Sequence, residues 1–294
     1  MIEPAAAADS VSTFAAPLIS QVYAYLAGGY QHYALFEESN AWARRAIAFG
    51  ERLNVSFAQA LGYEFLGENA VHLGEYAKGL EYAEREREIV ERIHSRERRA
   101  WTHFVAAMSS AHSGDHERAE REYTEGIALS EATGDRRAGY LLKGNYAALM
   151  AEQARDVGMN TPAGQALLER SLEFALENFR AGEESGLLYS RFEAHRCLAT
   201  IRLQRGELGE AEALCAAASA IVSETESRVS QLWLGPLYME VLMAAAENDP
   251  DQAAAKLELA RNVLSKYQEL VAVCQSPRFV REAAEWEKKL SNRQ

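Results

Sequence analysis

The stretch ALGYEFLGENAVHLGEY, residues 60–76, contains a helical segment that ends at a glycine, followed by an acidic and an aromatic residue that begin the next segment. Parts of it return at a fixed distance along the chain. His72 lies 40 residues after His32 and 40 residues before His112. A repeat of this length indicates a chain built from stacked copies of one supersecondary unit.

Other positions share this spacing, including Phe36, Tyr76 and His116. Within each unit the pattern predicts a helix, a tight turn and a second helix. The turn glycine suits a left-handed helix C-terminus, and the acidic residue after it favours the next helix N-terminus. Turns of this kind are predicted at Gly114-Asp115 and Gly206-Glu207.

The joints between units give the expected organisation of the chain. They fall near positions 54, 94, 134, 186 and 227, so the fourth unit is about a dozen residues longer than the others, with an insertion near 156–164. Ser276-Pro277 has the signature of a helix start. We expect an N-terminal tail (1–17), a repeat array (18–275) and a C-terminal capping helix (276–294) that covers the last apolar face. No sustained strand alternation is present.

Composition narrows the class of protein. Hydrophobic residues make up 48% of the chain and charged residues 25%, which is sufficient for a continuous core. The formal net charge of -12 disfavours binding to nucleic acid or to an anionic membrane surface. Three widely spaced cysteines give no disulfide framework. A signal peptide begins with basic residues, but this sequence has no Lys or Arg before Arg44. A cytoplasmic location is therefore expected.

Three segments carry a resemblance to a known family. They are Gly74-Glu75-Tyr76 with Leu80 and Ala83, Gly114-Asp115-His116 with Ala119, Tyr123 and Gly126, and Gly206-Glu207-Leu208 with Ala211, Cys215 and Ala218. These segments resemble the tetratricopeptide repeat, over roughly residues 18–270. The units exceed the usual 34 residues. The longer period is similar to arrays in bacterial signalling proteins, such as MalT-type regulatory ATPases, nucleotide-cyclase fusions and receptors for short signalling peptides.

The resemblance implies an all-α fold, a right-handed α-solenoid of about six helical hairpins with a capping helix. It also implies that the first helix of each hairpin lines a concave binding face. Carried over position by position, this predicts a ligand- or peptide-binding surface with these members: Gln31, His32, Glu64, Glu68, His72, Trp101, Phe104, Met108, His112, Asn145, Glu152 and Arg196.

Several of these positions allow more than one interpretation. Trp101 and Phe104 are candidate anchors for a partner, since binding energy concentrates on such residues, but they also suit packing between neighbouring helices. The three histidines fit inherited polar positions, a pH-sensitive groove or a metal site, although a helix spacing of roughly 10 Å is wide for a shared zinc ion. The charge-dense stretch 81–99 is interpreted as a solvated outer face.

The sequence contains no recognisable catalytic motif. It lacks a phosphate-binding loop, a dinucleotide-binding fingerprint, a nucleophile elbow and the helical zinc-binding motif of metalloproteases. We therefore expect no enzyme activity, cofactor or metal, and a non-catalytic scaffold that holds a protein or peptide segment in its concave groove. A ligand-sensing module with a small-molecule ligand, taken from a larger regulator, is the alternative. Self-association through terminal faces, with Trp233 and Trp286 contributing, also stays open.

Overall fold

The computed structural model describes residues 15–293, and these form thirteen α-helices with no strand among them. Residues 1–14 of the predicted tail lie outside the described part, whereas residues 15–17 belong to the first described helix. The chain divides into two compact units, one ending at Ala138 and the other beginning at Gly139. Each unit is described below by itself.

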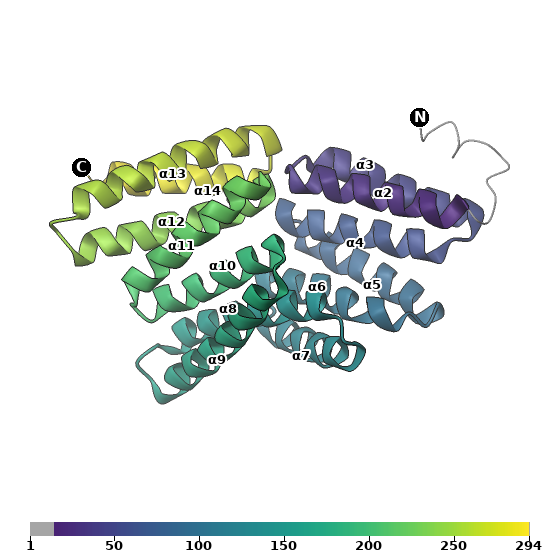
Figure 1. Cartoon of the computed structure of the whole chain (residues 1–294), viewed down its shortest axis with the longest axis horizontal. Coiled ribbons are helices and arrows are strands. Elements are labelled where there is room, and N and C mark those ends of the chain that lie inside the picture. Colours follow the sequence, from purple (N-terminus) through teal and green to yellow (C-terminus); the bar gives the residue numbers. More distant parts are fainter. Residues whose placement is uncertain (1–14, 294) are drawn as a thin grey trace. The chain divides into compact units, whose positions relative to one another are not determined.

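Successive helices of the first unit lie side by side and run in opposite directions (Figure 1). The helices are α2 (Ala15–His32), α3 (Phe36–Leu53), α4 (Ser56–Leu73), α5 (Tyr76–Arg92), α6 (Arg96–Ser113) and α7 (His116–Thr133), followed by the first residues of α8 (Arg136–Val157). They make three hairpins: α2 with α3, α4 with α5 and α6 with α7.

The hairpins turn where the sequence predicts. Gly74 and Gly114 close α4 and α6 with φ values of 78° and 83°, in the left-handed region that glycine adopts without strain. Asp115 then begins α7, because its side chain accepts a hydrogen bond from the backbone N–H of Arg118 at 3.1 Å. The glycine and the acidic residue after it thus act as one unit that ends a helix and begins the next.

One layer of the first unit consists of the first helices of the hairpins. Besides its two chain neighbours, α4 contacts both α2 and α6. We call α2, α4 and α6 the first-helix layer, and α3, α5 and α7 the second helices. This is the arrangement that the repeat spacing predicts, because equivalent residues of successive units lie on adjacent parallel helices.

Close helix approach holds the hairpins together. Gly62 of α4 faces α3 so tightly that an added Cβ would lie 2.5 Å from Cγ1 of Ile47 and 2.6 Å from the carbonyl oxygen of Ala43. Ala43 is fully buried there, and Ala60 is fully buried where α4 packs on Ile89 and Val90 of α5. Small residues at these positions let two backbones come together and bury the larger side chains around them.

The second unit contains three further hairpins and a single last helix. After α8 come α9 (Pro162–Ser185), α10 (Leu188–Gln204), α11 (Leu208–Thr225), α12 (Arg228–Asn248), α13 (Ala253–Cys274) and α14 (Pro277–Ser291). The longer fourth pair has its additional residues mainly in its helices, since α8 and α9 have 22 and 24 residues. A short connection joins them, and Thr161 caps α9 by accepting a hydrogen bond from the N–H of Gly164 at 3.0 Å.

The last helix, α14, packs through one face only. Its buried residues, Phe279, Ala283, Trp286 and Leu290, follow the three- and four-residue spacing of an amphipathic helix. It contacts both α13 and α12.

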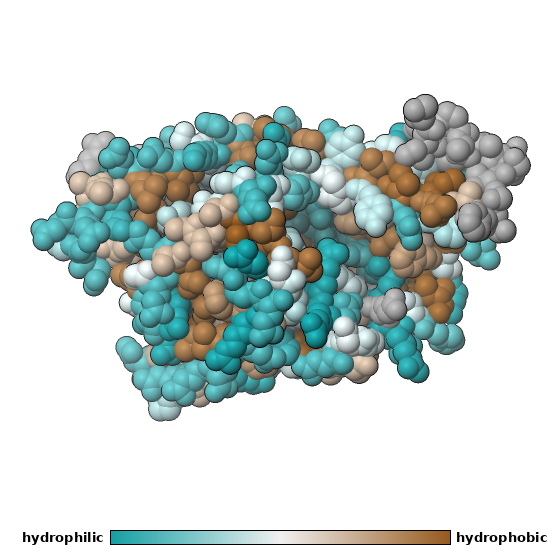
Figure 2. Space-filling view, viewed as in Figure 1, coloured by the Kyte–Doolittle hydropathy of each residue, from teal (hydrophilic) through white to brown (hydrophobic). Residues whose placement is uncertain are grey.

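Near the other end of the chain, Figure 2 shows hydrophobic side chains gathered over α2. Leu18 of this helix is 54% exposed.

The all-α fold of six helical hairpins and a terminal helix, predicted from the repeat, is confirmed over residues 15–293. Within that range no helix combines the length and the apolar character needed to cross a membrane.

The close approach at Gly62 can be tested with a matched pair of substitutions. Gly62→Ala should lower the free energy of unfolding, because the new methyl group clashes with α3 even though alanine favours helix. Gly29→Ala, in the last turn of α2, would meet no described atom within 4 Å. It should raise the free energy of unfolding by about 0.5–1 kcal/mol. Denaturant unfolding of both variants measures this, and equal stabilisation by both would contradict the packing.

Candidate functional site

The three repeated histidines lie at equivalent places, each in the last turn of a first-layer helix. His72 stacks on Phe36 with ring centroids 5.3 Å apart, and His112 stacks on Tyr76 at 5.5 Å. Each pair joins the end of one first-layer helix to the start of the second helix in the preceding hairpin. The 40-residue spacing therefore corresponds to a repeated packing contact between hairpins.

The aromatic pair of the third hairpin is buried. Trp101 and Phe104 expose 9% and 5% of their surface and pack edge to face, with centroids 6.0 Å apart. The indole N–H of Trp101 donates to Asp135 at 3.0 Å, and the Arg137 guanidinium lies 5.0 Å from its ring centroid. Trp101 therefore packs within α6, against the turn before α8 and against the first turn of α8, which agrees with the packing role considered from the sequence. Met108, one turn beyond Phe104, stays half-buried.

A buried charge cluster crosses the first-helix layer into α5. Arg98 of α6 forms ion pairs with Glu64 of α4 and with Glu86 of α5, the latter at 2.6 Å. Glu86 is fully buried, and its second carboxylate oxygen has no hydrogen-bond partner among the described residues. Glu68 lies one turn beyond Glu64 on α4 and is half-buried. Two carboxylates therefore contact the Arg98 guanidinium, and a third, that of Glu68, lies close to Glu64.

This imbalance changes the acidity of the cluster. Burial raises the pKa of Glu86 to about 8, although the charge of Arg98 opposes the rise. Burial and the neighbouring Glu64 raise the pKa of Glu68 to about 7, against a hydrogen bond from Gln31. A carboxyl group out of water favours its neutral form unless a cation compensates it. The charges of Arg98 and Arg137 do not fully compensate the three carboxylates, so the protonated forms of Glu68 and Glu86 are favoured near neutral pH.

Gln31 connects this cluster to a second group of polar side chains. Its amide donates to Asn69 at 3.0 Å. The Asn69 amide in turn donates to Ser39 at 2.8 Å and to Asn40 at 2.9 Å, both on α3. The polar residues predicted on α2 and α4, Gln31, Glu64 and Glu68, are thus brought together, and they are accompanied by Asn69, which the sequence analysis did not single out.

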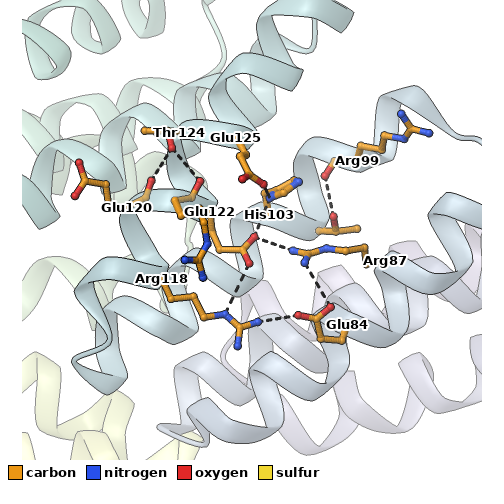
Figure 3. A network of polar contacts seen from close by, with 11 residues as sticks. Glu84, Arg87, Arg99, His103, Arg118, Glu120, Glu122, Thr124 and Glu125 are labelled. Carbon is orange, nitrogen blue, oxygen red and sulfur yellow. Dashed lines mark hydrogen bonds and ion pairs between the residues drawn. The ribbon is translucent and has the colours of Figure 1, made fainter.

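A further ionic network lies between α5, α6 and α7 (Figure 3). Glu122 accepts from Arg87 at 2.7 Å and contacts Nδ1 of His103 at 2.8 Å, while Arg118 bonds to Glu84 at 2.7 Å. Burial alone would raise the pKa of Glu122, but the hydrogen bonds from His103 and Arg87 together with their charge lower it below its ordinary value. Here, in contrast to the first cluster, the cations suffice for the carboxylates.

The interpretation of residues 81–99 as a solvated outer face is wrong at two positions. Glu86 is fully buried and Arg98 is only 8% exposed. A signal for Glu86 exists in the sequence: together with Gly79, Ala83 and Val90 it forms a row spaced by four, three and four residues, the pattern of a buried helix face. The position of Glu86 in this row therefore indicates burial, although its charge indicates exposure.

The predicted residues of the second unit fall into two groups. Arg196 of α10 pairs with Glu193 at 2.8 Å and approaches the amide oxygen of Asn145 at 3.5 Å. Asn145 also donates to the carbonyl of Leu141 at 2.8 Å. Glu152 is exposed and forms a long salt bridge with Arg155, with nitrogen and oxygen 3.9 Å apart. The structure therefore brings Asn145 and Arg196 together and leaves Glu152 apart.

The remaining reactive groups favour neither nucleophilic chemistry nor metal binding. Burial raises the pKa of both Cys197 and Cys215 to about 12, so each is a neutral thiol at physiological pH and a poor nucleophile. Within residues 15–293, no group of three or more His, Cys, Asp or Glu side chains is arranged to hold a metal ion.

Comparisons with known proteins bear on the fold. No protein-family model and no curated protein matches the sequence. Among solved structures, a Rap protein complexed with Competence and Sporulation Factor is similar, with a TM-score of 0.60 and 13% sequence identity. The match covers 92% of this chain and 75% of that chain. The chain has a helical repeat fold of this type. At this identity the likeness concerns architecture alone.

The buried charge cluster predicts how stability depends on pH. The folded-state pKa values of Glu86 (about 8) and Glu68 (about 7) lie above the ordinary value of 4.5. Between these values the folded protein binds more protons than the unfolded chain, so the free energy of unfolding falls as pH rises from 4.5 through 8. Glu86→Gln should lessen this fall, and it should make the protein more stable than wild type above pH 8.

Denaturant unfolding at several pH values measures both effects. Glu91→Gln, an exposed glutamate on the same helix, is the control and should follow the wild-type profile. Parallel profiles for wild type and Glu86→Gln would contradict the assignment.

The histidine contact gives a separate prediction. His72→Ala should lower the free energy of unfolding by about 1 kcal/mol because the ring stack with Phe36 is lost, whereas His72→Phe should keep it. Thermal unfolding at pH 7.5 distinguishes the two variants. A loss in His72→Phe as large as in His72→Ala would point to a polar role for the imidazole.

Proposed function

We propose that this protein is a non-catalytic scaffold that binds a peptide or protein segment on its first-helix layer. The helical repeat fold supports this, because stacked hairpins present a long continuous surface to an extended partner. The Rap protein of similar fold was solved with a bound factor, which makes partner binding a reasonable role for this architecture.

The observation that carries the proposal is the unbalanced charge at Glu68. This half-buried carboxylate lies beside Glu64, and burial and Glu64 raise its pKa to about 7 although the charges of Arg137 and Arg98 oppose the rise. A Lys or Arg side chain of a partner would replace the proton on Glu68 and supply the missing positive charge. Charged groups in partly desolvated positions are also where partner choice is strongest.

An apolar neighbour completes the proposed surface. Met108 of α6 stands 40 residues after Glu68, so the two occupy equivalent positions on adjacent helices of the layer. Both are half-buried. A flexible thioether next to a carboxylate suits a segment that carries a basic residue and an apolar residue close together. We therefore include Glu68 and Met108 in the binding surface, with Gln31 at its edge.

Selection from a random peptide display library tests the proposal without a known partner. Peptides enriched on the wild-type protein should contain Lys or Arg next to an apolar residue. They should bind Glu68→Gln about tenfold more weakly, since an ion pair of this kind contributes about 1.4 kcal/mol. Their affinity for wild type should rise between pH 6 and pH 8 as Glu68, with a pKa of about 7, loses its proton.

Glu91→Gln on α5 serves as the matched control, because it removes the same charge from a second helix. Equal affinity for wild type and Glu68→Gln would exclude this surface. Enrichment of acidic peptides would do the same.

A further inference from the structure

A separate cavity of about 340 Å³ lies in the second unit, between α12 and α14. Its α12 side includes Trp233, Pro236 and Glu240, which are spaced by three and four residues and so share one face of the helix. Its α14 side includes Glu285 and Trp286. The volume falls at the lower end of the range for small-molecule sites, about 300–1,000 Å³.

The packing of α14 explains why the space remains open. Phe279 packs edge to face on Tyr267 of α13, with ring centroids 6.5 Å apart, and the Tyr267 hydroxyl donates to Glu282 at 2.6 Å. These contacts fix α14 against α13. On the α12 side, Pro236 lies inside the helix and lacks a backbone N–H, so the regular hydrogen-bond ladder is interrupted beside the cavity.

Two indole rings give the cavity its chemical character. The Arg278 guanidinium lies 4.5 Å from the centroid of Trp233, and the Lys289 ammonium lies 4.2 Å from the centroid of Trp286. Indole faces attract cations, and paired aromatic rings are a common means of recognising ammonium groups. The chain's own cations thus show that these rings stand where a positive charge is stabilised.

The charges around the cavity favour a cation as well. Three carboxylates line it, those of Glu240, Glu282 and Glu285, against two cations. Glu282 accepts the Tyr267 hydrogen bond. Glu240 and Glu285 form no ion pair with any residue in the described part of the chain. A positively charged ligand would compensate these two carboxylates, whereas an anion would meet an excess of negative charge.

We propose that the cavity between α12 and α14 is a binding site for a small organic cation bearing an alkylammonium or guanidinium group. The cation exchanges with Arg278 and Lys289 at the Trp233 and Trp286 rings, and Glu240 and Glu285 at the rim balance its charge. Such a group can belong to a free small molecule or to a modified side chain. The site is independent of the first-helix layer, because it involves other helices in the other unit.

Calorimetry and tryptophan fluorescence with defined probes test the proposal on the full chain. Choline is compared with 3,3-dimethyl-1-butanol, which has the same shape but no charge, and agmatine supplies a guanidinium group. A short peptide carrying trimethyllysine distinguishes a side-chain source from a free molecule. At least one cation should bind saturably, and the neutral alcohol should bind at least about tenfold more weakly.

Substitutions locate the binding. Glu240→Gln and Glu285→Gln should each weaken the cation several-fold and leave the neutral alcohol unchanged, and Trp233→Leu should weaken both. Glu287→Gln is the control, since Glu287 is exposed on α14 and does not line the cavity. Circular dichroism checks that each variant folds. Equal binding of choline and the alcohol, equal losses in the control, or no saturable cation binding would each overturn the proposal.

Discussion

Close approach of helix backbones is the constraint on which the rest of this structure depends. Gly62 allows α4 to lie directly against Ala43 and Ile47 of α3, and Gly79 allows α5 to meet Ser109 of α6 in the same way. At the ends of the helices, aromatic rings join successive hairpins in the repeated stacks of His72 on Phe36 and His112 on Tyr76.

The interior of the first unit contains two ionic clusters that differ in their balance of positive and negative charge. Around Glu122, two arginines and a histidine hold the carboxylate in its charged form, so that network acts as a fixed connection between α5, α6 and α7. Around Arg98, carboxylates are in excess and protons make up the difference. Because burial and Glu64 raise the pKa of Glu68 to about 7, a cation from a partner can take the place of its proton near neutral pH.

Much of the fold was predictable from the sequence, because it follows from local signals. The glycine-acidic turns and the 40-residue spacing gave the hairpins and their order, as the caps at Gly74 and Gly114 show. The site was less predictable. Trp101 is a residue type typical of anchors, yet it is buried and donates a hydrogen bond to Asp135 in the turn before α8. Glu86 is buried although its charge predicts exposure. The cavity beside Pro236 depends on how α14 rests on α13, a tertiary contact without a local signal.

The joints between hairpins have a consequence for how such a chain changes length. Asn54 and His94 both adopt left-handed backbone conformation, with φ values of 55° and 52°, although neither is glycine. The segment 55–94 therefore follows one left-handed residue, Asn54, and ends at another, His94. Duplication or excision of that whole segment would rejoin helices in an orientation the chain already uses. The array can thus gain a whole hairpin without a new type of connection between helices. The sequences of the copies can then diverge.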